Sequence, residues 1–139
     1  MYSFVGAQEK VQMVILVGYI PSPEGRAALA AGIAEARLRE AKLVVAHASP
    51  APSENSPKDH NLDHLKSELD ATGLDYELRA GFWGMSADDY IVNLADAVDA
   101  SLVVIGVRKR TPVGKFFLGS NTQRILLDAT CPVLSVKAL

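Results

Sequence analysis

The chain alternates short apolar runs with stretches in which apolar residues recur every three or four positions. Three apolar runs predict strands buried on both faces of a parallel sheet: Val11 to Tyr19, Leu43 to Ala48 and Leu102 to Ile105. In Leu74 to Ala80, apolar and charged residues alternate, which predicts a half-exposed strand at a sheet edge. The last apolar run, Cys131 to Ala138, predicts a closing strand.

The segments between these runs predict four helices. The first opens at Ser22, which is followed by a proline suited to the first helical position and an acid near the positive end of the helix dipole. A second helix is predicted around Leu62, Leu65 and Leu69, which share one face. The third and fourth open with capping-box patterns at Ser86 to Asp89 and Ser120 to Gln123.

Strand and helix therefore follow one another as β-α-β-α-β-α-β-α-β. This alternation predicts an α/β fold, an open five-stranded parallel sheet with helices on both faces. Right-handed crossovers and the edge-like third strand favour the order 3-2-1-4-5. Ligands in such sheets bind beyond the carboxyl ends of the strands where the winding reverses, here strands one and four. Two loops leave that point, Gly18 to Ser22 and Gly106 to Ser120.

Composition narrows the class of protein. The 139 residues are 49% apolar and 22% charged, as in an ordinary soluble domain. We expect one domain over residues 11–139, with residues 1–10 as a loose extension. Cys131 is the only cysteine, which fits a reducing cytoplasm, and no apolar run reaches the roughly 18 residues that span a bilayer.

Charge is distributed unevenly along this net-acidic chain, whose formal charge is −2. From Ala100 to Leu127 there is no acidic residue, but there are five basic ones: Arg108, Lys109, Arg110, Lys115 and Arg124. The stretch includes Gly119-Ser120, where a helix start offers free backbone N–H groups to an anion. The residues alone leave two interpretations open, a phosphate-binding loop and a solvated basic loop ahead of an ordinary capped helix.

The glycines of this loop carry a resemblance to a known family. Gly106, Gly119 and Ser120 fit the nucleotide-binding signature G-x2-G-x9-G-[S/T] of the universal stress protein family, which the chain resembles from Val14 to Val136. The resemblance implies an adenine nucleotide alpha hydrolase-like, Rossmann-like fold and a role in stress response. It also implies that the signature wraps the phosphates of ATP, that an aspartate after the first strand holds the nucleoside, and that Ala48 lies beside adenine.

Two positions depart from the family pattern. Lys109 occupies the second glycine of the signature, which removes glycine's conformational freedom but offers an ammonium group to a phosphate. Ile20 stands where the resemblance implies the aspartate, and its side chain cannot accept a hydrogen bond from a ribose. Anion binding is therefore the firmer expectation, and selective ATP binding the weaker one.

From these observations we predict a stress-response regulatory module that binds an adenine nucleotide, ATP or AMP, or another phosphorylated ligand at the Gly106 to Ser120 loop. The predicted binding residues are Gly106, Arg108, Lys109, Gly119, Ser120, Asn121, Ala48 and Ile20. The alternative is a universal stress protein of the non-nucleotide-binding type that acts in protein–protein interaction. No nucleophile is paired with a base, so we expect no enzyme beyond weak, incidental ATP hydrolysis.

The sequence also bears on three other partners: a metal ion, nucleic acid and a second copy of the chain. His60 and His64 have a spacing that could hold a metal, but the surrounding loop favours a solvated helix end and no metal site. The basic cluster lacks interleaved aromatic residues for base stacking, so nucleic acid is not the expected partner. The final strand carries little charge or proline to protect a sheet edge, which predicts a homodimer through that strand.

Overall fold

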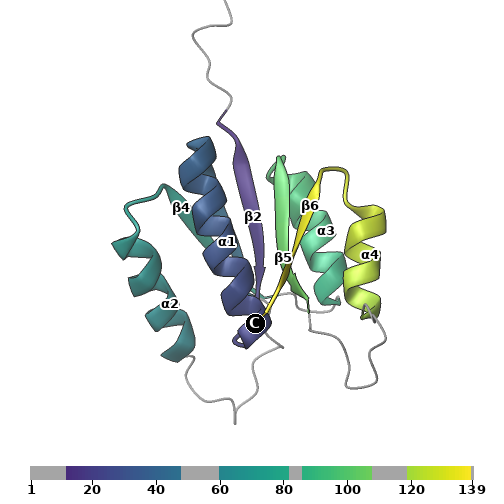
Figure 1. The fold of residues 1–139 in the computed structure, drawn as a ribbon, viewed down its shortest axis with the longest axis horizontal. Helices are drawn as coiled ribbons and strands as arrows, with labels where there is room; N and C mark the ends of the chain where they lie inside the picture. The colour runs from purple at the N-terminus through teal and green to yellow at the C-terminus, as the bar shows by residue number, and fades with distance from the viewer. Residues whose placement is uncertain (1–11, 48–59, 82–85, 108–118, 139) are drawn as a thin grey trace, which may run out of the picture.

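The computed structural model describes residues 12–47, 60–81, 86–107 and 119–138. Strands and helices alternate along this part of the chain (Figure 1). The strands are β2 (Val14–Tyr19), β3 (Lys42–His47), β4 (Tyr76–Ala80), β5 (Leu102–Val107) and β6 (Val133–Lys137). The helices are α1 (Pro23–Arg39), α2 (His60–Ala71), α3 (Ala87–Ala97) and α4 (Ser120–Asp128).

The strands form one parallel sheet in the order β4-β3-β2-β5-β6, which confirms the predicted 3-2-1-4-5 topology. The central strand β2 pairs with β3 on one side and β5 on the other, so that Val17 lies opposite both Val45 and Val104. Winding reverses between β2 and β5, at the predicted switch point.

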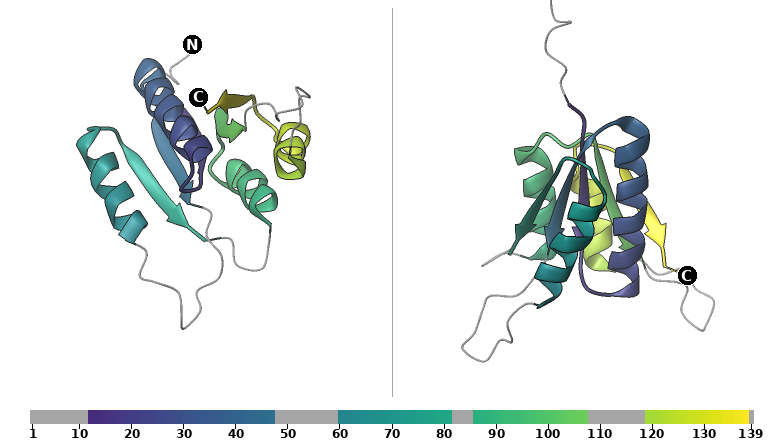
Figure 2. Two further views of the ribbon diagram at one scale, coloured as in Figure 1. Left: turned by 60° about the horizontal axis from the view of Figure 1, so that its bottom comes forward. Right: turned by 90° about the vertical axis from the view of Figure 1, so that its left-hand side faces the viewer.

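Two helices cover each face of the sheet, as the ribbon views show (Figure 2). The side chains of Ile15, Val17 and Tyr19 enter a core with α1 and α2. Those of Leu16 and Val103 enter a second core with α3 and α4. Because both faces are covered, β2, β3 and β5 are almost wholly buried, which explains their continuous apolar runs.

The edge strand β4 is shorter than predicted, since it begins at Tyr76 and not at Leu74. The residues just before it belong to a turn, in which the Thr72 hydroxyl accepts from the Leu74 amide at 3.2 Å. Ala80 is exposed, so the alternation does not place it in the core. Charged side chains guard this edge: Glu77 pairs with both Lys42 and Arg79.

Two of the predicted helix caps are confirmed and one is wrong. The Ser22 side chain accepts from the Gly25 amide at 3.0 Å, and Ser86 accepts from the Asp89 amide at 3.4 Å. Ser120 does not cap α4, because Gly119 takes the N-cap position and its carbonyl accepts the first helical hydrogen bond, from Gln123, at 3.0 Å. Ser120 is consequently the first helical residue.

Candidate functional site

The candidate site lies at the carboxyl ends of β2 and β5. These strands are neighbours in the sheet. Ile20 follows β2, and residues 108–118, which lie outside the described part of the chain, follow β5. The helix N-termini lie at this same end of the molecule, the lower end in Figure 1. Backbone N–H groups of helix N-termini and the ends of two strands therefore converge where the winding reverses.

On the β2 side, the chain closes tightly around the first turn of α1. A Cβ added to Gly106 would lie 2.0 Å from the Glu24 carbonyl oxygen, and one added to Gly25 would lie 1.7 Å from the Ile20 carbonyl oxygen. No side chain fits at either position, because the obstacle is backbone. With the Gly25 amide also bonded to Ser22, the start of α1 is packed and capped by the protein itself.

On the β5 side, no described side chain caps the first turn of α4. Gly119, the N-cap, makes no side-chain capping bond, and the amides from Gly119 to Thr122 have no acceptor within the helix. Ser120 and Asn121 are exposed. A Cβ added to Gly119 would meet none of the described residues within 4 Å, and its φ of −61° suits any amino acid. Within the described residues, packing does not require glycine here.

Arg124, which belongs to the basic stretch of the sequence, is already paired with acids. Its guanidinium lies 2.8 Å from the Asp89 carboxylate and 3.5 Å from that of Asp88, both in the first turn of α3. It also contacts Asp128 of its own helix at 3.2 Å. Asp88 and Asp89 lie in the first turn of α3, but nothing in the sequence reveals this bridge, because it depends on how α3 and α4 pack.

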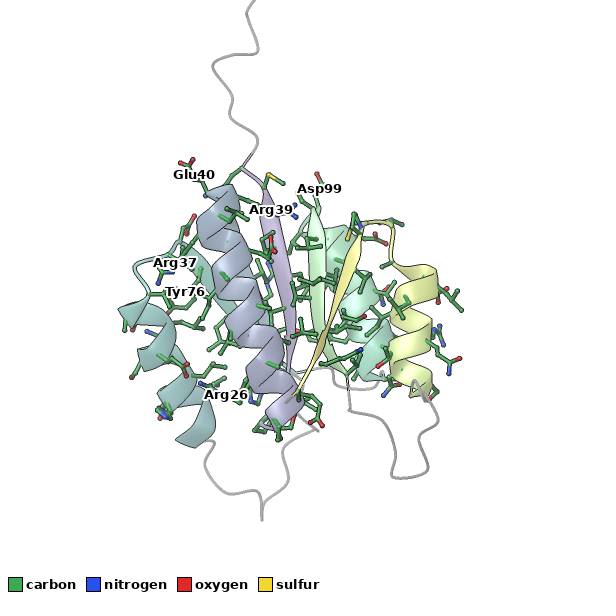
Figure 3. The ribbon with its side chains drawn as sticks, viewed as in Figure 1. Arg26, Arg37, Arg39, Glu40, Tyr76 and Asp99 are labelled. Atoms are coloured by element: carbon green, nitrogen blue, oxygen red, sulfur yellow. The ribbon has the colours of Figure 1, made fainter. Side chains whose placement is uncertain are left out.

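A second polar cluster lies on the other face of the sheet, beneath α1 and α2. His47 is buried, 3% exposed, and its ring lies 5.7 Å from that of Tyr19. Arg26 joins α1 to α2 through two hydrogen bonds to Glu68, at 2.8 and 2.7 Å (Figure 3). The bond to Glu68, followed by one to Tyr19, raises the pKa of Arg26, and the bond from Arg26 lowers the pKa of Glu68. This cluster supports the core and the contact between the two helices.

Of the predicted site residues, the structure brings Gly106, Gly119, Ser120, Asn121 and Ile20 to one end of the sheet. Ala48, Arg108 and Lys109 lie outside the described residues. In the part of the chain that is described, no cluster of three or more His, Cys, Asp or Glu residues could hold a metal ion. None of the described helices combines the length and apolarity needed to cross a membrane.

Fold and site define a class: a small, doubly wound α/β domain with an open helix N-terminus at the switch point of its sheet. Comparison of the sequence with known families is consistent with that class. The sequence profile of the Universal stress protein family matches residues 13–137. A "Universal stress protein" of Mycolicibacterium smegmatis is 38% identical over 127 residues, which cover 89% of this chain and 97% of the relative. The chain belongs to the universal stress protein family.

Solved structures of the family share the fold. The "universal stress protein from Archaeoglobus fulgidus in complex with dAMP" aligns with a TM-score of 0.65 and 27% identity, covering 92% of this chain and 100% of that one. A "universal stress protein in complex with cAMP" aligns with a TM-score of 0.68 and 26% identity, covering 94% of this chain and 100% of the other. Members of this fold family have thus been seen with adenine nucleotides bound.

Proposed function

We propose that this stress-response protein binds an adenine nucleotide, or another phosphorylated ligand, with a phosphate at the first turn of α4. The observation that carries the proposal is a contrast between two helix starts: a side chain caps α1, whereas no described side chain caps α4 at Gly119 to Thr122. Unpaired backbone amides at the positive end of a helix dipole bind phosphate. The two structural neighbours with dAMP and cAMP support the adenine nucleotide as the ligand class.

Other residues of the proposed site follow from the resemblance. Arg108 and Lys109 supply positive charge to the phosphate, and Ala48 lies beside the adenine. Ser120 and Asn121 contribute their amides, and the Ser120 hydroxyl is free of a capping role. We propose binding of ATP or AMP without a dedicated catalytic step, since backbone amides and a hydroxyl provide no general base.

Titration of the purified protein with ATP, AMP and cyclic AMP tests this proposal. We expect saturable binding to at least one of them below millimolar concentration by calorimetry. In amide-resolved NMR, the largest shifts are expected at Gly119 to Thr122. The Thr72 amide, which donates to the Leu69 carbonyl just after the C-terminal end of α2, serves as an internal control. No saturable binding, or shifts that spare the start of α4, would contradict the proposal.

A second candidate function, protein–protein interaction without nucleotide, is favoured by Ile20. This residue is 47% exposed at the end of β2, where it presents an apolar side chain in place of a hydrogen-bond acceptor. Mass spectrometry of the protein as purified separates the candidates. A retained nucleotide supports the first function, and its absence together with a flat titration supports the second.

We also propose a homodimer through β6. This strand pairs with β5 on one side, and Leu134 on it is 36% exposed. Among the described residues, β6 has no ion pairs like those that guard β4. The expected result by size exclusion with light scattering is a dimer at micromolar concentration. Leu134→Lys should weaken the dimer, whereas the control Leu38→Lys, at a side chain 79% exposed on α1, should not. A strict monomer would contradict this assembly.

A further inference from the structure

The bridge between α3 and α4 gathers unbalanced charge close to the proposed anion site. One guanidinium, that of Arg124, faces the carboxylates of Asp88, Asp89 and Asp128. Arg124 lies two to four positions after Ser120 to Thr122, which is about 3 to 6 Å along the helix at 1.5 Å per residue. The guanidinium that the acids of α3 contact therefore belongs to the second turn of α4, directly after the amides that the proposal assigns to a phosphate.

Asp88 depends on this bridge most strongly. The residue is 5% exposed, and its Oδ2 lies 3.5 Å from Arg124 Nε. Its Oδ1 has no hydrogen-bond partner within the described part of the protein. A buried carboxylate that is neither paired nor fully hydrogen-bonded is costly and exerts its field through a medium that screens poorly. Among the described residues, the guanidinium of Arg124 compensates the charge of the Asp88 carboxylate.

Asp89 is fixed by the same first turn. Its backbone amide donates to Ser86, and its side chain accepts from the Ser86 hydroxyl at 3.0 Å while contacting Arg124 at 2.8 Å. The capping of α3 therefore aims this carboxylate at α4. A chain of polar contacts therefore links the start of α3 to α4, through Ser86, Asp89 and Arg124.

We propose that Arg124 is a positioning residue of the anion site: it compensates the acids of α3 and holds the first turn of α4 against them, without contacting the ligand. The inference rests on the proposed function, because it assumes an anion at the start of α4. In the absence of Arg124, the carboxylates of Asp88 and Asp89 repel a phosphate there. Arg124 therefore belongs to the basic stretch of the sequence, but it pairs with acids of the protein and does not bind the ligand.

A double-mutant cycle read out as AMP affinity by calorimetry tests the inference. Arg124→Gln should weaken AMP binding about five- to tenfold, since two carboxylates near the anion lose their counter-charge in a partly protein medium. In a background carrying Asp88→Asn and Asp89→Asn, the same substitution should cost less than about twofold. Arg124→Lys, which keeps the charge, should lie near wild type. An undiminished penalty in the double-Asn background would overturn the inference, because it would mean that Arg124 contacts the ligand.

Ionic strength and a matched control separate this role from a purely structural one. Raising the salt from about 0.1 M to about 1 M shortens the screening length from about 10 Å to about 3 Å, so the Arg124→Gln penalty should shrink. Arg26→Gln removes a helix–helix bridge of similar exposure on the other face, 51% against 54%, and should leave AMP affinity unchanged. Equal AMP affinity in wild type and Arg124→Gln, with both folded by urea titration, would overturn the inference alone. Wild-type protein that binds no AMP would overturn the proposed function, and the inference with it.

Discussion

Gly106, which the structure places inside β5 and not in a loop, and Gly119, the N-cap of α4, meet different surroundings. Gly106 faces the backbone of α1, where a Cβ would lie 2.0 Å from the Glu24 carbonyl oxygen. Gly119 faces open space among the described residues. The first glycine is required by the packing of the fold, and the second is not. The two glycines of one sequence signature can therefore have different roles. Gly106 is needed for packing, whereas the described residues leave the surroundings of Gly119 free for a ligand.

The largest expected effect is the loss of the first glycine. Gly106→Ala should destabilise the protein by about 3 kcal/mol, because the new methyl group collides with backbone that cannot rotate away. The midpoint of urea unfolding measures the change. Gly119→Ala is the matched control, and we expect it to cost no more than about 1 kcal/mol, because alanine is only a poorer N-cap and meets no clash. Equal losses at the two positions would break the comparison.

A smaller effect on stability, but a large one on binding, is expected at the second glycine. Gly119→Asp places a capping carboxylate at the start of α4, where it bonds to the free amides and repels a phosphate. AMP affinity measured by calorimetry should fall more than about tenfold, while stability stays level or rises by less than about 0.5 kcal/mol, since glycine is already a tolerated N-cap. Gly119→Asn, which caps without charge, separates occupation of the amides from repulsion. Unchanged AMP affinity in both variants would place the phosphate elsewhere.

The smallest effect distinguishes the serines that accompany these glycines. Ser22→Ala should cost about 1 kcal/mol of stability, because the hydroxyl accepts from the Gly25 amide at 3.0 Å. Ser120→Ala should cost less than about 0.5 kcal/mol, since Ser120 caps no helix. Chemical denaturation of the two variants side by side is sufficient. A larger loss for Ser120→Ala would show that its hydroxyl has a structural role after all.

The architecture could be predicted from the sequence because each strand and helix has a recognisable pattern of apolar and polar residues. Continuous apolar runs predicted β2, β3 and β5, and the charged alternation predicted that β4 lies at an edge, although it begins two residues late. The caps at Ser22 and Ser86 followed from short-range patterns. At Ser120 the same pattern was wrong, because the Gly119 backbone starts the helix one residue earlier.

The candidate site was only partly predictable. The switch point follows from strand order, which fixed the positions of Ile20 and Gly106 relative to each other. The bridge from Arg124 to Asp88 and Asp89 could not be foreseen, since residues far apart in sequence meet only when α3 packs on α4. Gly106 lies within β5, and its contact with Glu24 likewise depends on how α1 packs on the sheet.

The contact between Gly106 and α1 has a consequence for how relatives diverge. A descendant that abandoned its ligand would remain under selection to keep this glycine, because the domain needs it to fold. The same descendant could replace Gly119 freely. Loss of ligand binding during evolution can therefore be visible at the closing glycine, whereas a retained first glycine reports only on ancestry and architecture.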